Sequence, residues 1–446
     1  MRKTPMPTTT DLSALAVDDS QLGATAVAAH TESREARTHR ISTGALVALV
    51  GLLLLWAVTK THGSAAFALS DAFDAVKLPT VTVPGVPVVL VCAVLCLLAA
   101  AGFVSGRMVG RMPALAGTIA GVAAILGFLT WAAAGRGLPF PVANQFAGTL
   151  QVATPLILGA LCGVMCERAG VVNVAIEGQM LTAAFAAALT GSITQSIPAA
   201  LVAGVLASVA MAALLALFSI KYLVDQVVLG VVLNLLASGL TGFLFDQLVQ
   251  KDAAHYNNAP LMQKLPIPGL SKIPFFGNIL FNQTILAYLA VLSVALVWFL
   301  LYRTKWGLRV RAVGEHPKAA DTVGISVTRT RWQAVLVGGV FAGLGGAFFT
   351  IGSIGAFSKD ITVGNGFIAL AALIMGRWRP GLATVMALFF GFVVQMAGQL
   401  QTISTPMPSQ FLIILPYVAT IIAVAGLVGR VRGPAADGLP YVKEGH

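Results

Sequence analysis

Several stretches of this chain are apolar except for a few amide and carboxylate side chains, and these side chains carry the first chemical signal. Residues 167–191, ERAGVVNVAIEGQMLTAAFAAALTG, include Asn173, Glu177 and Gln179. A carboxylate at the centre of a lipid bilayer costs about 2.5–3.5 kcal/mol. Because Asn173 and Glu177 are four residues apart, a helix would place both on one face. That face should therefore border a cavity or a neighbouring helix.

Polar residues of the same kind recur in later apolar stretches. They are Asp225, Gln226 and Asn234, then Asn365, and finally Gln395 and Gln399. Amide and carboxylate groups can form hydrogen bonds with a neutral, polar solute. We predict that some of these residues line a solute path, and the candidates are Asn173, Glu177, Gln179, Asn234, Asn365 and Gln395. The alternative for each residue is a structural bond to buried backbone or to one of the other helices that carry these residues.

Other kinds of reactive site find little support in the sequence. The four cysteines form two pairs, Cys92/Cys96 and Cys162/Cys166, in apolar runs that lack histidine. This setting favours small core residues over a zinc site. The six histidines lie in tails or loops, and no G-x-x-x-x-G-K-[ST] nucleotide-binding motif is present. We therefore expect no enzyme activity, no metal and no cofactor in this chain.

The composition identifies the surroundings in which these polar residues must work. Of 446 residues, 57% are hydrophobic and only 10% are charged, whereas a soluble chain carries about 25% charged residues. The 46 glycines fit closely packed transmembrane helices. The net charge of +11 is explained by cytoplasmic anchoring charges rather than by nucleic-acid binding. These features predict an all-α, polytopic membrane protein.

Apolar runs near the length of about 20 residues that spans a bilayer give twelve candidate transmembrane helices. Their approximate ranges are 42–59, 84–105, 113–134, 148–166, 170–190, 197–219, 225–249, 283–302, 332–354, 364–377, 380–400 and 410–428. The tenth is short and lies between glycines, so a re-entrant segment is its alternative. With the N-terminus inside, roughly three quarters of the 28 Lys and Arg residues lie on the cytoplasmic side. Both termini are therefore predicted to be cytoplasmic.

Two segments between these helices have local signals of their own. The basic loop of about residues 303–331 contains HPKAADTVGI, which predicts a short helix from Pro317 to near Gly324. In the ninth span, GGVFAGLGGAFF places small residues four apart, as in Gly339-x-x-x-Gly343 and Ala342-x-x-x-Gly346. Such a stripe predicts close packing against a neighbouring helix.

Four ordered motifs resemble one known family. CERAGVVNVAIEGQMLTAAFAAALTG, KWGLRVRAVGEHPKAADTVGISVTRTRW, GNGFIALAALIMGRWRPGLATVMALFFGF and GLVGRVRGPAADGLPYVKEGH are similar to motifs of bacterial ABC-importer permeases. That superfamily imports branched-chain amino acids, simple sugars and nucleosides. The Glu-Gly-Gln of the first motif and the Leu-Pro-Tyr-Val-Lys near the end most resemble its nucleoside branch. The likeness covers roughly residues 145–446.

The resemblance implies a division of the chain. Residues 1–40, which lack the apolar core of a signal peptide, form a disordered cytoplasmic tail. Residues 41–140 add accessory transmembrane helices outside the usual match. Residues 141–429 form the permease core with the coupling loop of about 303–331, and residues 430–446 form a cytoplasmic C-terminal tail.

The resemblance also implies partners and roles. Separate cytoplasmic ATPase subunits would hold ATP and magnesium, an extracytoplasmic lipoprotein would deliver solute, and a second permease chain would complete the pore of a bacterial plasma-membrane importer. The segment expected to dock on the ATPase contains Glu315, His316, Ala319, Ala320 and Gly324. Nucleosides are the expected solute, with a simple sugar or branched-chain amino acid as the alternative. An ion-coupled secondary transporter and a membrane scaffold are the rival functions.

Two interpretations of Glu177 remain open at this point. Its carboxylate could form hydrogen bonds with the solute as it crosses. Alternatively, it could stabilise a broken helix near Gly170 by accepting backbone N–H groups.

Overall fold

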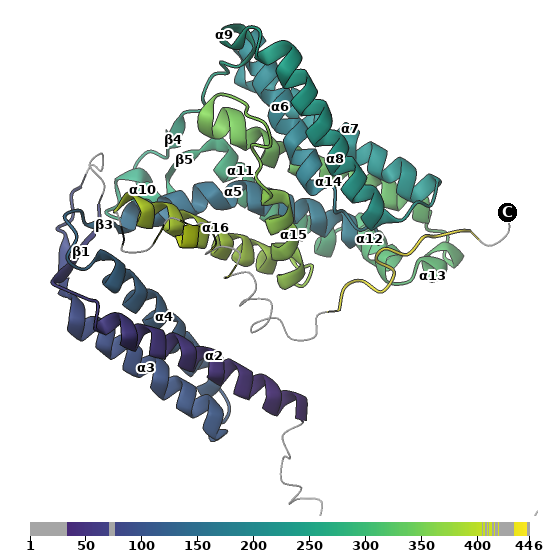
Figure 1. The fold of residues 1–446 in the computed structure, drawn as a ribbon. Coiled ribbons are helices and arrows are strands. Elements are labelled where there is room, and N and C mark those ends of the chain that lie inside the picture. Colours follow the sequence, from purple (N-terminus) through teal and green to yellow (C-terminus); the bar gives the residue numbers. More distant parts are fainter. Residues whose placement is uncertain are drawn as a thin grey trace, which may run out of the picture. The chain divides into compact units, whose positions relative to one another are not determined.

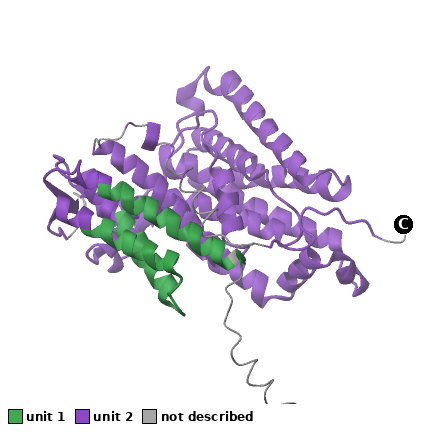
Figure 2. Cartoon of the chain, turned by 60° about the horizontal axis from the view of Figure 1, so that its bottom comes forward, with its two compact units in different colours: residues 1–55, 91–125 green, residues 56–90, 126–446 purple. Residues whose placement is uncertain are grey.

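A computed structural model describes residues 34–70, 76–403, 405, 408, 410–412, 414, 418 and 432–443. The described chain is mostly helical (Figure 1). It divides into two compact units (Figure 2). Residues 1–55 and 91–125 form unit 1, and residues 56–90 and 126–446 form unit 2.

Unit 1 consists of the greater parts of three helices, α2 (Arg34–Val58), α3 (Gly85–Ser105) and α4 (Met112–Ala133). Within this unit α2 and α3 pack closely, because a Cβ atom on Gly51 would lie 2.9 Å from the Leu97 side chain. Arg40 closes one end of the pair by donating a 2.9 Å hydrogen bond to the Val104 carbonyl. Elsewhere these helices expose apolar side chains along most of their length.

Unit 2 is built on eight long or intermediate helices. They are α5 (Val142–Glu167), α6 (Ile176–Thr194), α7 (Ile197–Ala216), α8 (Gln226–Leu244), α11 (Ile285–Arg303), α14 (Val327–Phe349), α15 (Asn365–Met375) and α16 (Pro380–Thr402). Shorter helices are α9 (Ala253–Tyr256), α10 (Phe276–Leu280), α12 (Lys305–Glu315) and α13 (Pro317–Thr322), with a 3-10 turn η4 (Leu270–Lys272). One π-helical turn extends each of α7, α8 and α14: η2 (Leu217–Lys221), η3 (Phe245–Val249) and η5 (Thr350–Ile354).

Short strands join the loops of unit 2. β1 (Ser64–Ala68) pairs antiparallel with β2 (Val81–Pro84) and parallel with β3 (Phe140–Pro141), in the order β2-β1-β3. The register of the parallel pair places Phe67 opposite Phe140. A second, antiparallel pair joins β4 (Lys264–Pro266) to β5 (Asn282–Thr284).

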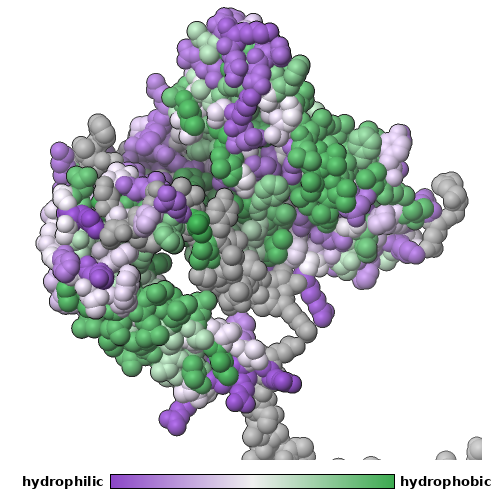
Figure 3. Space-filling model, in the orientation of Figure 1, coloured by the Kyte–Doolittle hydropathy of each residue, from purple (hydrophilic) through white to green (hydrophobic). Residues whose placement is uncertain are grey.

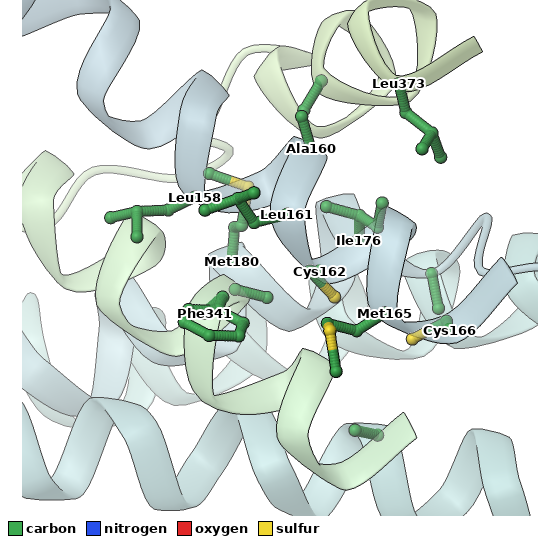
Figure 4. Packing of buried hydrophobic residues seen from close by; sticks show 14 of the residues in the cluster. Leu158, Ala160, Leu161, Cys162, Met165, Cys166, Ile176, Met180, Phe341 and Leu373 are labelled. Carbon is green, nitrogen blue, oxygen red and sulfur yellow. The ribbon is translucent and has the colours of Figure 1, made fainter. Parts of the chain in front are cut away.

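α5 is the central helix of the core. In its most apolar stretch 83% of the residues are buried, and it packs against α14, α15, α16 and α11. Side chains of α5, α6, α14 and α15 meet in one cluster, including Leu161, Met180, Phe341 and Leu373 (Figure 4). The outer faces of unit 2 remain apolar, and the space-filling view shows wide hydrophobic areas of surface (Figure 3).

The glycine stripe predicted in the ninth span is a packing surface. A Cβ atom on Gly339 would lie 2.7 Å from Ala212 of α7, and one on Gly343 would lie 2.7 Å from Val205. On Gly346 it would lie 2.2 Å from the Met180 carbonyl oxygen of α6. α14 therefore approaches the backbones of α6 and α7 at distances that no larger residue allows.

Eleven of the twelve predicted spans coincide with a helix, and the range 410–428 lies largely outside the described residues. Within the described part of the chain, nine helices are long and apolar enough to cross a membrane. α6 and α15 are not among those nine. α15 has 11 residues, about 16 Å of helix against a hydrocarbon core of about 30 Å. The polytopic helical class is confirmed, while the count of twelve and the position of the termini stay predictions.

Two of the differences between predicted and observed boundaries change a predicted assignment. The range 170–190 is not helical throughout, because α6 begins only at Ile176. Gly170 adopts a φ of +82°, which ends the preceding helix, and residues 171–173 have no regular structure. The other difference is at the front, where α2 begins at Arg34, within the range predicted as a tail. Residues 1–33 of that tail lie outside the described chain.

Candidate functional site

The non-helical segment before α6 is held by two side chains of α8. Gln226 accepts a 2.7 Å hydrogen bond from the Val172 N–H. Asn234 accepts a 2.8 Å bond from the Gly178 N–H and donates a 3.0 Å bond to the Val174 carbonyl. Asn234 therefore satisfies one of the free amides at the N-terminus of α6 and fixes the break before it.

Glu177, in the first turn of α6, binds the N-terminus of α15. Its Oε1 accepts bonds from the Thr362 hydroxyl at 2.5 Å and from the Gly364 N–H at 2.9 Å. Its Oε2 accepts a 2.6 Å bond from the Gly366 N–H. A carboxylate in this position satisfies free amides and opposes the positive end of the helix dipole. Glu177 thus accepts backbone N–H groups, but from α15 rather than from the break near Gly170.

Glycine is required where the two helix N-termini meet. A Cβ atom on Gly366 would lie 2.5 Å from both the N and the Cα atoms of Glu177. The first turns of α6 and α15 are therefore in backbone contact. α5 lies beside both helices at Gly159, where a Cβ atom would meet Ala369 of α15 at 2.8 Å and Ile176 of α6 at 3.4 Å.

The loop of residues 355–364, which leads into α15, is fixed by side chains from other elements. Asn257 forms two bonds with Phe357, donating to its carbonyl at 3.0 Å and accepting from its N–H at 2.7 Å. Ser238 of α8 donates to Asp360 at 2.8 Å. Asp360 has a φ of +52°, a conformation that costs on the order of 1–3 kcal/mol. The loop is thus held in a strained shape against α8.

Asn173 does not share a helical face with Glu177, so that prediction is wrong. Asn173 precedes α6 and is completely buried. It donates to Gln179 at 3.3 Å and to the sulfur of Cys162 at 3.2 Å. The physical reason is the break at Gly170, which releases Asn173 from the helical periodicity on which the prediction depended. Asn173 and Gln179 form a closed polar cluster with Cys162 of α5. This cluster is separate from the Glu177 carboxylate.

The last two candidates lie in different places. Asn365, the first residue of α15, is half-buried and donates a 2.7 Å bond to the Thr362 carbonyl beside Glu177. Gln395 of α16 lies against Gly148 of α5, where a Cβ atom would meet its amide nitrogen. Gly148 is about 16 Å along α5 from Gly159 at 1.5 Å per residue. The structure therefore brings Asn234, Glu177 and Asn365 together and leaves Gln395 outside this group.

The predicted short helix is present as α13, and α12 precedes it. Ala320 is buried with Val313 of α12 and Val327 of α14. The other members of the segment, Glu315, His316, Ala319 and Gly324, are exposed. Gly324 ends the turn with a φ of +82° and has no atom within 4 Å of its Cβ position. α13 is thus anchored by one alanine and presents its other side outward.

A buried polar group near α12 was missed by the sequence reasoning. Arg331, counted as a basic loop residue, is only 2% exposed. Glu167 is 3% exposed and accepts a bond from the Trp378 indole N–H. Glu167 ends α5, Arg331 belongs to α14, and Trp378 lies in the turn after α15. The only sequence signal for the two charged residues is a charge next to an apolar run. Among the described residues, no group of three or more His, Cys, Asp and Glu side chains could hold a metal ion.

Comparisons with known proteins agree with this architecture. Residues 145–436 match the family model described as the permease component of the branched-chain amino acid transport system. The guanosine ABC transporter permease protein NupQ of Bacillus subtilis is 40% identical over 306 residues, covering 66% of this chain and 95% of its own. The nucleoside ABC transporter permease protein NupC of Lactococcus lactis is 40% identical over 307 residues, covering 67% and 96%.

A third relative carries a different name. The putative glucose ABC transporter permease protein TsgC13 of Haloferax volcanii is 35% identical over 308 residues, covering 65% of this chain and 92% of its own. No solved structure matches the chain. These relatives are transport subunits rather than enzymes, and nine described helices suit a membrane. The chain therefore belongs to the family of branched-chain amino acid transport permease components, as a multi-pass protein of the bacterial plasma membrane.

Proposed function

We propose that this permease imports nucleosides as the membrane subunit of an ATP-binding-cassette importer. The observation that carries the proposal is the meeting of two helix N-termini, α6 and α15, joined by Glu177. Broken helices that meet inside a membrane protein are a recurring way to build a solute site. The solute class comes from the two relatives at 40% identity, whose names specify guanosine and nucleosides.

The solute path is proposed to pass the junction of α6 and α15. A nucleoside carries hydroxyls, ring nitrogens and exocyclic groups, which can bond to the amides and carboxylate gathered there. Asn365 is half-buried beside Glu177 and is the first candidate for direct contact. Glu177 and Asn234 hold the two helix N-termini, so passage of solute requires the loop of residues 355–364 to change its bonds to Glu177. Asn173 and Gln179 support α6 from the closed cluster, and Gln395 belongs to another part of the path.

Energy would enter through α13. In the proposed complex, separate ATPase subunits bind ATP and magnesium and dock on the segment that contains Glu315, His316, Ala319, Ala320 and Gly324. The anchoring of Ala320 supports this role, because a docking helix must transmit force to the elements behind it. This arrangement places α13 and both termini in the cytoplasm and includes the range 410–428 as the twelfth span. A second permease chain and an extracytoplasmic substrate-binding lipoprotein complete the proposed importer.

Uptake by the purified complex tests the proposal. The permease is reconstituted in proteoliposomes with its ATPase subunits and second permease, and radiolabelled guanosine is supplied with the lipoprotein outside. We expect ATP-dependent accumulation that unlabelled adenosine reduces and that excess glucose or leucine leaves unchanged. Competition by glucose instead would favour a sugar importer, as the name of the third relative suggests. Uptake by the permease alone, driven by an ion gradient, would make it a secondary transporter.

A further inference from the structure

The C-terminal segment of residues 432–443, here called the C-terminal strap, lies on unit 2 and is buried at Pro434 and Ala436. Ala436 donates a 2.9 Å hydrogen bond to the Gly314 carbonyl near the end of α12. Ala435 donates a 3.2 Å bond to the Glu315 carboxylate. Tyr441 packs against the apolar cluster that includes Ala320 of α13. Figure 1 shows this end of the chain running beside α12 and α13. The strap therefore holds both helices of the proposed coupling segment.

The other side of the strap meets the break between α5 and α6. Arg331 donates a 3.0 Å bond to the Leu439 carbonyl of the strap and a 3.2 Å bond to the Ala169 carbonyl after α5. A Cβ atom on Gly170 would lie 2.9 Å from the Ala436 carbonyl oxygen. The buried guanidinium of Arg331 on α14 thus bonds both to the strap and to Ala169, which lies four residues before Asn173. Buried arginine is costly unless bonds of this kind compensate it.

A strained turn closes the same region. Arg377 and Trp378 have φ values of +54° and +53°, each costing on the order of 1–3 kcal/mol. Arg168 stabilises the turn with a 2.9 Å bond to the Trp378 carbonyl. Trp378 in turn donates to Glu167 at the end of α5. The turn follows α15 directly, so the region adjoins the C-terminus of α15 as well as the segment that leads into α6.

Asp437 is the acidic residue of the strap and lies next to these groups. Burial raises the pKa of Asp437 to about 7, and interactions with Glu167 and Arg331 oppose that rise. The Asp437 side chain is half-buried, its Oδ1 atom is shielded from solvent, and it lies close enough to Glu167 and Arg331 to interact with both.

We infer that the C-terminal strap is a mechanical link that transmits movement of α13 to the break before α6 and to the turn after α15. Arg331 and Asp437 are its positioning residues. The inference rests on the proposed function, because it assigns a route between ATPase docking and the junction of α6 and α15. The link is short: Gly314 and Glu315 lie at the end of α12, and Ala169 is seven residues before α6 begins.

The test compares two truncations of the full chain in the complete importer. One ends at Val431 and removes the strap, and the matched control ends at Lys443 and removes only residues 444–446. Folded yield is followed by size-exclusion chromatography, together with ATP hydrolysis and guanosine uptake. We expect the strapless chain to hydrolyse ATP normally while the ratio of uptake to ATP hydrolysed falls at least about tenfold, which corresponds to about 1.4 kcal/mol. The control should match the full chain.

Point variants keep the inference testable if the strapless chain fails to fold. Asp437→Asn and Arg331→Lys are compared with Arg329→Lys, because Arg329 is exposed on the same helix. We expect a lower ratio of uptake to ATP hydrolysed for the first two variants, with the Km for guanosine unchanged, and a normal ratio for the third. An unchanged ratio in folded strap variants would overturn the inference and leave the proposed function intact. Absence of ATP-dependent uptake by the full chain would instead overturn the proposed function and the inference with it.

Discussion

The N-terminal helices α2–α4 and the central helix α5 are all long and apolar, but they differ in how much surface they bury. In the most apolar stretch of each helix, 22%, 33% and 22% of the residues are buried in α2, α3 and α4, against 83% in α5. The family match begins at residue 145, after these three helices. Apolar composition is thus enough to place a helix in lipid, whereas the permease core also needs close packing and paired polar groups.

The two regions also differ in the partners of their polar side chains. In α4 the Thr118 hydroxyl is exposed and bonds only to the Ala114 carbonyl of its own helix. In unit 2, Glu177, Asn234 and Arg331 each join different segments of the chain. Substitutions in the core should therefore disturb transport, while matched substitutions in α2–α4 should not.

The largest effect is expected at Glu177. Glu177→Leu leaves the Gly364 and Gly366 amides and the Thr362 hydroxyl without their acceptor, and each buried unpaired donor costs about 1–3 kcal/mol. We expect uptake per folded protein to fall at least about tenfold, and the folded yield to fall as well. Glu177→Gln keeps one acceptor oxygen and should give an intermediate result.

Thr118→Val is the control for this pair, and guanosine uptake per folded protein is the measurement. Uptake that falls only in proportion to folded protein would make Glu177 purely structural. A Thr118→Val variant that loses uptake would contradict the division between the two regions.

Glycine-to-alanine changes compare packing in the two regions directly. Gly346→Ala places a Cβ atom 2.2 Å from the Met180 carbonyl oxygen, and overpacking of this kind costs about 1–3 kcal/mol. Gly121→Ala in α4 meets no atom within 4 Å and should stabilise its helix by up to about 1 kcal/mol. Thermal unfolding in detergent measures both. Equal melting temperatures for the two variants would mean that α14 is less tightly packed than described.

A change in backbone conformation separates coupling from stability. Gly324 after α13 and Gly110 before α4 have φ values of +82° and +65°, and both Cβ positions are open. Valine at either site is strained by about 1–3 kcal/mol. Gly324→Val should lower the ratio of uptake to ATP hydrolysed, because the strain would displace α13 from the proposed contact with the ATPase. Gly110→Val should leave that ratio unchanged. A normal ratio in both variants would show that α13 does not couple ATP hydrolysis to uptake.

The smallest effect is expected from removing the front of the chain. A chain that begins at Leu138 lacks α2–α4 and also β1, which pairs with β3 in unit 2. We expect it to insert and to keep its preference for guanosine over glucose, with a melting temperature a few degrees lower. Radiolabel uptake and thermal unfolding measure the two properties. Loss of solute preference in a folded, inserted chain would show that the accessory helices take part in recognition.

The sequence was sufficient for features that depend on nearby residues. Apolar runs located eleven helices, and the pair Pro317 and Gly324 located α13. The spacing of Gly339 and Gly343 likewise predicted close packing against a neighbouring helix, which in the structure is α7. Each of these signals depends only on residues that are close together in the sequence, so no knowledge of the rest of the chain was needed.

Features that depend on distant partners were not accessible in this way. Arg331 bonds to carbonyl groups 162 and 108 residues away, at Ala169 and Leu439, so it resembled an ordinary basic residue of a loop. The acceptor role of Glu177 was one of two interpretations, but its donors lie 187 and 189 residues further along the chain. Asn173 was misplaced because the left-handed conformation of Gly170 interrupts a pattern that otherwise continues smoothly.

If solute passes the junction of α6 and α15, as proposed, the junction has a consequence for the charge of that solute. Each helix N-terminus is equivalent to about half a positive elementary charge, and the Glu177 carboxylate lies where two of them meet and offsets that charge. A neutral molecule needs no counter-charge at such a point, whereas an anion or a cation would find none there. Removal of that carboxylate would leave about one uncompensated positive charge in a medium of low dielectric constant. Discrimination against nucleotides, which differ from nucleosides by their phosphate charge, would then be the first property to weaken.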